Sequence, residues 1–378
     1  MAATDGTSIE LVRFGLIGSG AITTLSHLPA LAALPQARLV AAADLDRERA
    51  AEVAAQGGAD EVYTDFRDLV ASPNVDAVIV AIPNVYHRDA VVAAAQAGKH
   101  VFCEKPLATN LRDAREMIAA CEAANVKLMV GFNQRFWNQV DIAKEIIDSG
   151  ALGEVKAFRS VYSEDWDVYP AATQYRYDLK QSGGACIIDL TIHRIDLARY
   201  LLGEITSLCA EIKHSVIPPK VDDNVWLLCN FENGATGCIS SDRFSPMVAN
   251  ATDVFGTQGT LYLSSETTNP FQSVPLAVYT EKPLDQVPAV ITDYIYPEAW
   301  WEKPSNSWVS IVPPRDSAYV KELGAFCASI LNDTDPPVTG EDGYKSLEIV
   351  LAAYLSVRER RWVDLPLTVD EVAPPDFD

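Results

Sequence analysis

Short apolar runs alternate with helical stretches over the first third of the chain. Apolar runs lie at residues 14–17, 38–43, 99–103 and 127–131, and residues 114–124 have the pattern of one intervening helix. Strands that are apolar on both faces are typical of a parallel sheet covered by helices. The pattern predicts an α/β domain with a parallel sheet over residues 1–131.

The pattern changes to longer strands from residue 155 onward. The strands are expected at residues 155–162, 206–216, 224–231, 235–241 and 251–263. Asn233-Gly234 predicts a hairpin turn between two of them. Residues 319–331 and 343–359 read as two helices that pack back on the fold. These features predict an α+β domain over residues 132–378 with a large open, mostly antiparallel sheet.

A glycine turn follows the first apolar run. It is formed by Gly18, Ser19, Gly20, Ala21 and Ile22. Gly18 permits a tight turn, and Gly20 lets a pyrophosphate approach free N–H groups at a helix N-terminus. Thr23 replaces the small third residue of the dinucleotide fingerprint, so an ordinary strand-to-helix turn remains an alternative.

Asp44 ends the second apolar run, about 26 residues beyond Gly18, where a dinucleotide-binding unit carries an acid for the ribose. A carboxylate there accepts hydrogen bonds from ribose hydroxyls and repels a 2′-phosphate, so NAD is expected as the cofactor in preference to NADP. With the glycine turn, Asp44 predicts that residues 1–131 form a Rossmann dinucleotide-binding domain. Arg47 and Arg49 could form a phosphate clamp, but the mixed charges around them favour an exposed helical turn.

Lys105 follows a buried strand, between Glu104 and Pro106. Because Pro106 cannot continue the strand, Lys105 is expected at the carboxyl edge of the sheet, where such folds bind ligands. The alternative is a strand-end lysine that only reaches solvent.

Asp189 and His193 are four residues apart, so they share one face if this segment is helical. A neutral imidazole titrates near working pH, which makes His193 the candidate general base. The alternative is a helix with a capping aspartate and a buried structural histidine.

Together these motifs resemble the glucose-fructose oxidoreductase, inositol dehydrogenase and rhizopine-catabolism (Gfo/Idh/MocA) family, with the inositol dehydrogenase branch the most similar. The resemblance spans nearly the whole chain, through residues 15–22, 76–84 with His87, 97–107, 130–136, 149–155, 183–197 and 338–343.

The resemblance implies an NAD-dependent dehydrogenase acting on a sugar, glycoside or cyclitol, with Lys105, Asp189 and His193 as catalytic residues. Further cofactor contacts are implied at Ile82, Pro83, Asn84, His87, Glu104 and Lys105. Substrate contacts are implied at Lys105, Asn133, Gln134, Arg176, Asp189 and His193. The open sheet forms the oligomer contact in the family, which implies a homodimer or homotetramer.

Composition narrows the partners. A formal charge of −22 over 378 residues argues against nucleic acid and anionic membranes, and favours a neutral polyol as substrate. No run approaches a membrane span, and the amino terminus lacks a secretory pattern, so a cytoplasmic protein is expected. Seven scattered cysteines fit buried free thiols better than disulfides or zinc, and no metal site is predicted.

Three functions remain open from the sequence. The first is reversible oxidation of a secondary alcohol. The second is redox-assisted elimination or glycoside cleavage with tightly bound NAD, and the third is a non-catalytic sugar or dinucleotide sensor, which would need no general base. The tryptophan-rich stretch within residues 264–316 could stack on a sugar or fill a subunit contact.

Overall fold

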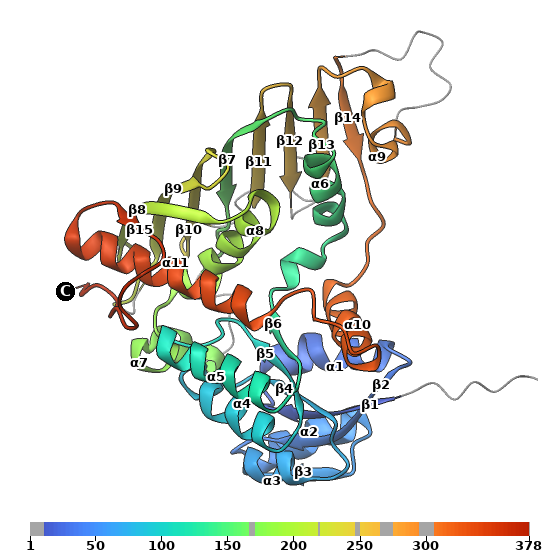
Figure 1. The fold of residues 1–378 in the computed structure, drawn as a ribbon. Coiled ribbons are helices and arrows are strands. Elements are labelled where there is room, and N and C mark those ends of the chain that lie inside the picture. The colour runs from blue at the N-terminus through green and yellow to red at the C-terminus, as the bar shows by residue number, and fades with distance from the viewer. Residues whose placement is uncertain are drawn as a thin grey trace, which may run out of the picture. The chain divides into compact units, whose positions relative to one another are not determined.

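The computed structural model describes residues 11–165, 171–217, 220–245, 250–264, 275–294 and 306–377. The chain divides into two compact units (Figure 1). The first comprises Met1–Gly131 and Ser317–Tyr344, and the second comprises Phe132–Asp316 and Lys345–Asp378. Trp300 and Trp301 lie outside the described residues, so the proposed uses of the tryptophan-rich stretch stay predictions.

The first unit is the predicted Rossmann-type sheet. Its strands are β1 (Val12–Ile17), β2 (Ala37–Ala43), β3 (Glu61–Tyr63), β4 (Ala77–Val80), β5 (His100–Glu104) and β6 (Leu128–Gly131). All pairings are parallel, in the order β3-β2-β1-β4-β5-β6. The intervening helices are α1 (Leu28–Ala33), α2 (Arg47–Gly57), α3 (Phe66–Ala71), α4 (His87–Gln96) and α5 (Leu111–Ala123). The strand order reverses between β1 and β4, where such sheets bind ligands at the carboxyl ends of their strands.

A helix from the end of the chain completes this unit. Helix α10 (Ala318–Leu331) packs on α1 and β1, with Phe326 buried. The Phe326 ring lies 6.2 Å from that of Phe14 and 5.9 Å from that of Phe102, so α10 covers the sheet with apolar side chains. The first unit therefore contains residues 317–344 in addition to residues 1–131, whereas the sequence analysis assigns all residues after 131 to the second domain.

The second unit is built on a nine-stranded sheet. Its strands are β7 (Val155–Val161), β8 (Ile205–Lys213), β9 (Asn224–Phe231), β10 (Thr236–Asp242), β11 (Ala251–Gly256), β12 (Gly259–Ser264), β13 (Leu276–Thr280), β14 (Trp308–Ile311) and β15 (Val363–Asp364). The order is β14-β13-β12-β11-β7-β10-β9-β8-β15, and only β7 and β10 pair in parallel. The predicted α+β class with a mostly antiparallel sheet is confirmed.

Two turns in this sheet test the strand predictions. Gly234 has φ +83°, and its N–H donates to the Phe231 carbonyl at 3.0 Å, which confirms the turn between β9 and β10. The single strand predicted over residues 251–263 is wrong, because the segment folds into the antiparallel hairpin β11–β12. Thr257 and Gln258 form its turn between Gly256 and Gly259, and these glycines are a turn signal that the strand prediction passed over.

Helices of the second unit include α6 (Asn138–Asp148), α7 (Leu179–Ser182), α8 (Ile192–Leu202) and α9 (Ala289–Thr292). Helix α11 (Gly340–Glu359) begins in the first unit and continues through the second. Its Ser356 hydroxyl accepts a hydrogen bond from the Ala210 N–H of β8 at 3.0 Å. No helix among the described residues is long and apolar enough to cross a membrane. All seven cysteines are described, and each is a free thiol.

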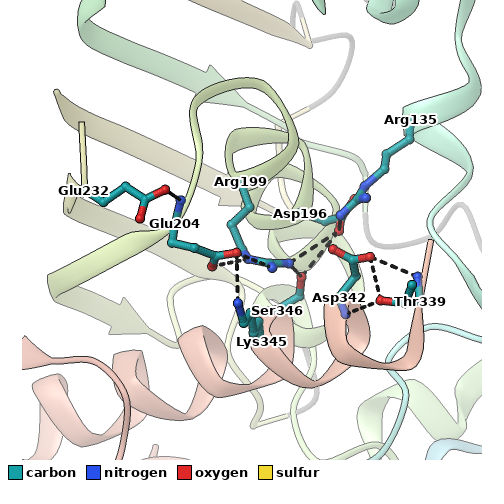
Figure 2. Close-up of polar contacts among 9 residues, drawn as sticks. All are labelled: Arg135, Asp196, Arg199, Glu204, Glu232, Thr339, Asp342, Lys345 and Ser346. Carbon is teal, nitrogen blue, oxygen red and sulfur yellow. Dashed lines mark hydrogen bonds and ion pairs between the residues drawn. The ribbon is translucent and has the colours of Figure 1, made fainter. Parts of the chain in front are cut away.

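Helix α8 is buried along its whole length except at Tyr200, yet it carries several charged side chains. Asp196 forms a bidentate pair with Arg135, at 2.7 and 2.5 Å (Figure 2). Arg199 bonds both oxygens of Glu204 and the Ser346 hydroxyl of α11, the latter at 3.2 Å. The buried charges are therefore matched by partners from three other segments of the same unit.

Breaking the Arg135–Asp196 pair should be costly. Arg135→Leu removes the bidentate partner of the buried Asp196, whose contacts with Arg199 and Ser346 are longer, and we expect a loss of about 3 kcal/mol in the free energy of unfolding, measured by urea denaturation. Lys156→Ala is the matched control, because its 2.6 Å pair with Glu154 is exposed and should be worth less than about 1 kcal/mol. Equal losses in the two variants would contradict this reading of the pair.

Candidate functional site

The glycine turn after β1 has the geometry of a phosphate-binding turn. Gly18 has φ +101°, and a Cβ there would lie 2.2 Å from the Ala81 carbonyl oxygen, so only glycine fits. A Cβ on Gly20 would meet no protein atom within 4 Å. Packing thus does not require glycine at position 20, whereas approach of a ligand to the backbone would. Ser19 is buried, and its hydroxyl has no hydrogen-bond partner among the described residues.

Thr23 is accommodated at the third fingerprint position. Its side chain is fully buried, and its hydroxyl donates to the Gly18 carbonyl at 2.7 Å. The helix starts with a π-helical turn at Thr23–His27 before α1 begins. The wider turn and the satisfied hydroxyl let a larger residue occupy the position without disturbing Gly18.

Asp44 lies at the end of β2, close to the turn. One oxygen accepts from the Ser19 N–H at 2.8 Å, and the other accepts from the Asp46 N–H at 2.9 Å. These bonds hold the carboxylate and leave further lone pairs for ribose hydroxyls. The open face at Gly20, the Ser19 hydroxyl and the fixed Asp44 carboxylate fit an NAD molecule.

The segment after β4 contains the next predicted cofactor residues. Ile82 and Pro83 lead into a short 3₁₀ turn at Asn84–Tyr86, and Asn84 is buried. His87 is fully buried, with Nδ1 2.9 Å from the Pro106 oxygen and Nε2 2.8 Å from the Ile82 oxygen. Burial lowers the pKa of His87, although the carbonyl groups oppose this. His87 thereby ties two backbone segments together, and its contact with the cofactor stays a prediction.

Lys105 follows directly after β5, as predicted, and so sits at the carboxyl end of the parallel sheet. Its N–H donates to Glu104 Oε2 at 3.2 Å, and Glu104 Oε1 lies 2.8 Å from Nε2 of the buried His27. Burial alone would raise the pKa of Glu104, but the hydrogen bond from His27 and the nearby positive charges lower it overall. An ionised Glu104 therefore anchors the backbone at Lys105.

In the second unit, Asp189 lies in a π-helical turn, Ile187–Thr191, that leads into α8. Arg176 Nε lies 3.2 Å from its carboxylate, and Arg243 forms a second, shorter ion pair. Arg243 is fully buried, and Asp189 is 7% exposed. Two guanidinium groups favour the charged carboxylate, so Asp189 is a poor proton acceptor. Arg176, a predicted substrate residue, here serves as a partner of Asp189.

His193 lies in the first turn of α8 and is 8% exposed. Its ring makes edge contacts with Phe132 and Tyr162, each with centroids 6.1 Å apart. These aromatic rings pack against the imidazole and limit its rotation, which suits a positioned general base.

The segment after β6 provides the other predicted substrate residues. Asn133 and Gln134 belong to a short 3₁₀ helix, Asn133–Phe136. Gln134 is buried, and its side-chain oxygen has no partner among the described residues, so it is able to accept from a hydroxyl. Arg135 in the same turn pairs with Asp196, which fixes this turn relative to the helix that carries His193.

Sequence reasoning missed two residues that hold this site. Arg243 follows β10 directly, but β10 is rich in polar residues, so Arg243 did not show the pattern of a cation after an apolar strand that marks Lys105 after β5. His27 gave no signal either, because its partner Glu104 is 77 positions away in the sequence.

The comparisons agree with both units. Residues 12–132 match the model of an oxidoreductase family with an NAD-binding Rossmann fold, GFO_IDH_MocA, and residues 140–262 match a GFO/IDH/MocA C-terminal domain. Myo-inositol 2-dehydrogenase from Thermotoga maritima is 32% identical, over 94% of this chain and 98% of its own. Levoglucosan dehydrogenase from Pseudarthrobacter phenanthrenivorans is 28% identical, over 95% of this chain and 99% of its own.

Solved structures are also similar. A levoglucosan dehydrogenase in complex with NADH has a TM-score of 0.81 at 27% identity, and the match covers 94% of this chain and 100% of that one. The fold and the glycine turn define an NAD-binding oxidoreductase. The chain belongs to the Gfo/Idh/MocA oxidoreductase family.

The two glycines of the turn should respond differently to alanine. Gly18→Ala forces a clash with the Ala81 carbonyl, so thermal unfolding should shift down by several degrees. Gly20→Ala should leave the unfolding temperature nearly unchanged but weaken NAD binding by about tenfold or more, measured by titration calorimetry. If Gly20→Ala binds NAD as tightly as the wild type, the pyrophosphate does not bind at this turn.

Proposed function

We propose that this protein oxidises a secondary alcohol of a cyclitol, sugar or glycoside with NAD, reversibly. The observation that carries the proposal is the arrangement in the second unit, where a carboxylate held by two arginines precedes an aromatic-lined histidine on the same helical segment. The relatives support the substrate class, because they are named as dehydrogenases of myo-inositol and levoglucosan.

The chemistry needs three groups. The alcohol loses its proton while negative charge grows on the oxygen. Neutral His193 takes that proton, since Asp189 is committed to its two arginines. Asp189 orients the site or accepts from a neighbouring substrate hydroxyl, and the Lys105 ammonium stabilises the developing alkoxide. When bound, NAD supplies the acceptor for the hydride.

Residues of the first unit would hold the cofactor. Gly18 to Ile22 would bind the pyrophosphate, and Asp44 the adenosine ribose. Glu104 would support the cofactor side through the Lys105 backbone, which it already anchors. Asn133 and Gln134 would bind substrate hydroxyls, for which the Gln134 oxygen is suited. The Asp189 cluster has one carboxylate and two guanidinium groups, so the support for a neutral sugar or cyclitol comes from the named relatives and not from the charge of this cluster.

Asp44 should decide between the two nicotinamide cofactors. The carboxylate repels a 2′-phosphate, so NAD should bind at least about tenfold more tightly than NADP, a difference of ~1.4 kcal/mol. Asp44→Ala should narrow that ratio, while Asp46→Ala, a change at the neighbouring helix cap, should keep it. Equal affinities in the wild type, measured by titration of both cofactors, would overturn the assignment.

His193 should account for the acid limb of the pH profile. In a screen of inositols, anhydrosugars and aldoses, NADH absorbance should rise, and kcat/KM should fall as pH drops through the histidine range, about pH 8 to 5. The limb should vanish in His193→Ala, which should retain NAD binding. His100→Ala is the control, because His100 begins β5 at the opposite edge of that sheet from Lys105.

Two results would contradict the mechanism. Near-normal rates with an unchanged profile in His193→Ala would exclude His193 as the base. Conversion of a glycoside without accumulation of free NADH would favour the elimination reaction with retained cofactor.

A further inference from the structure

The segment that carries Asp189 and His193 cannot cap its own start. Gly183, Gly184 and Ala185 precede it and offer no polar side chain, and Cys186 makes no capping bond. The first backbone N–H groups of a helix need acceptors when they are buried. Ala185, Cys186 and Ile187 are all fully buried, so their acceptors must come from another part of the chain.

Asp222, two residues before β9 and 35 positions beyond Ile187, provides all three acceptors. Its Oδ1 accepts from the Ala185 N–H and its Oδ2 from the Ile187 N–H, both at 2.7 Å. Its backbone oxygen accepts from the Cys186 N–H at 3.1 Å. The Asp222 side chain is itself fully buried. Three successive N–H groups, ending two residues before Asp189, are thus held by one residue.

The main chain of the neighbouring Asp223 contacts Arg243, which is an arginine partner of Asp189. The Asp223 backbone oxygen accepts from the Arg243 N–H at 3.0 Å, and the Arg243 guanidinium pairs with Asp189. The Asp223 contact is made by its main chain and is kept when its side chain is substituted, whereas the carboxylate of Asp222 itself holds the helix start.

We infer that Asp222 is a positioning residue for the oxidation, because its carboxylate fixes the first turn of the segment that carries Asp189 and His193. The inference rests on the proposed function. Close packing leaves little freedom elsewhere at this turn: Gly184 has φ +154°, and the Tyr354 hydroxyl bonds the Gly183 oxygen at 3.3 Å. A displacement of the turn by about an ångström would move the base relative to its substrate and slow the proton transfer.

Asp222 and Asp223 form a matched pair for the test. The Asp223 carboxylate is equally buried and accepts from Ser215, Val216 and Ile217 N–H at 2.7, 2.7 and 3.0 Å, in a loop that carries no proposed catalytic residue. Asparagine at either position keeps the shape but turns one acceptor into a donor that faces an N–H. The two substitutions therefore impose a similar defect on two different segments.

The assays should be made at about pH 8. Burial raises the pKa of Asp222 to about 6, against the two backbone N–H donors and the charge of Arg243. The other ionisable groups around it are Cys186 and Tyr354. The Asp222 carboxylate is ionised at the chosen pH, so its substitution removes a charge as well as an acceptor.

In the full-length protein with NAD, Asp222→Asn should lower kcat by about tenfold or more while the Kd of NAD stays within about twofold of wild type. Asp223→Asn should lower thermal stability to a similar degree yet keep kcat within about threefold. A kcat near wild type in Asp222→Asn, or equal losses of kcat in both variants, would overturn the inference.

Hydrogen exchange separates this inference from the proposed function. Amides 185–187 should exchange faster in Asp222→Asn and not in Asp223→Asn, whereas amides 215–217 should show the reverse. This pattern tests the hold on the helix start even if no panel substrate is oxidised by the wild type, a result that would count against the proposed function alone. Unchanged exchange at 185–187 in Asp222→Asn would refute the positioning role.

Discussion

Charge pairing inside a buried helix is the constraint on which the second unit depends. Helix α8 is enclosed on all sides but carries Asp196, Arg199 and the candidate base His193. An isolated buried charge would cost several kcal/mol, roughly, so each must meet a partner. Asp196 meets Arg135, Arg199 meets Glu204 and Ser346, and Arg194 lies over the rings of Trp137 and Tyr162. The segments that flank the candidate site are consequently tied to one helix.

The same requirement shapes the first unit on a smaller scale. Glu104 is enclosed at the end of β5 and is balanced by His27, while Asp44 is satisfied by two backbone N–H groups. Each carboxylate also holds a segment with a proposed role. Glu104 accepts from the Lys105 N–H, and Asp44 accepts from the Ser19 N–H of the glycine turn. The interactions that neutralise these buried charges therefore also hold the proposed site residues in place, as supporting contacts do for reactive groups in general.

The fold was largely predictable because its signals are local. Short continuous apolar runs indicate strands that are buried on both faces, as in a parallel sheet, and Asn233-Gly234 indicates a hairpin. The β11–β12 hairpin was missed although Gly256 and Gly259 flank its turn, because the strand-like pattern on both sides was taken as one strand. The membership of α10 in the first unit escaped for another reason: an apolar helix face does not state which sheet it covers.

The site was predictable where a residue marks the end of an element. Lys105 after β5, Gly18 after β1 and Asp44 after β2 are readable in this way, and Asp189 and His193 lie on one continuous helical segment, while their roles stay predictions. Residues that act through distant partners were not readable, as Arg243 and Asp222 show. Their distances in sequence from Asp189 and Ala185 are 54 and 37 positions, and only the β8–β9–β10 pairing brings them close. A buried aspartate just before a strand has no local pattern that distinguishes it from a turn residue.

Direct hydride transfer is the central claim, and isotope tracing tests it most directly. The protein should be incubated with NAD and an inositol or anhydrosugar that carries deuterium on the carbinol carbons, and the nucleotide analysed by mass spectrometry. The account predicts that the reduced nucleotide carries deuterium from the substrate, and that His193→Ala forms it far more slowly at the same bound NAD. Two results would contradict the account. One is reduced nucleotide that contains no deuterium from the substrate, and the other is that no reduced nucleotide forms with any substrate of the panel.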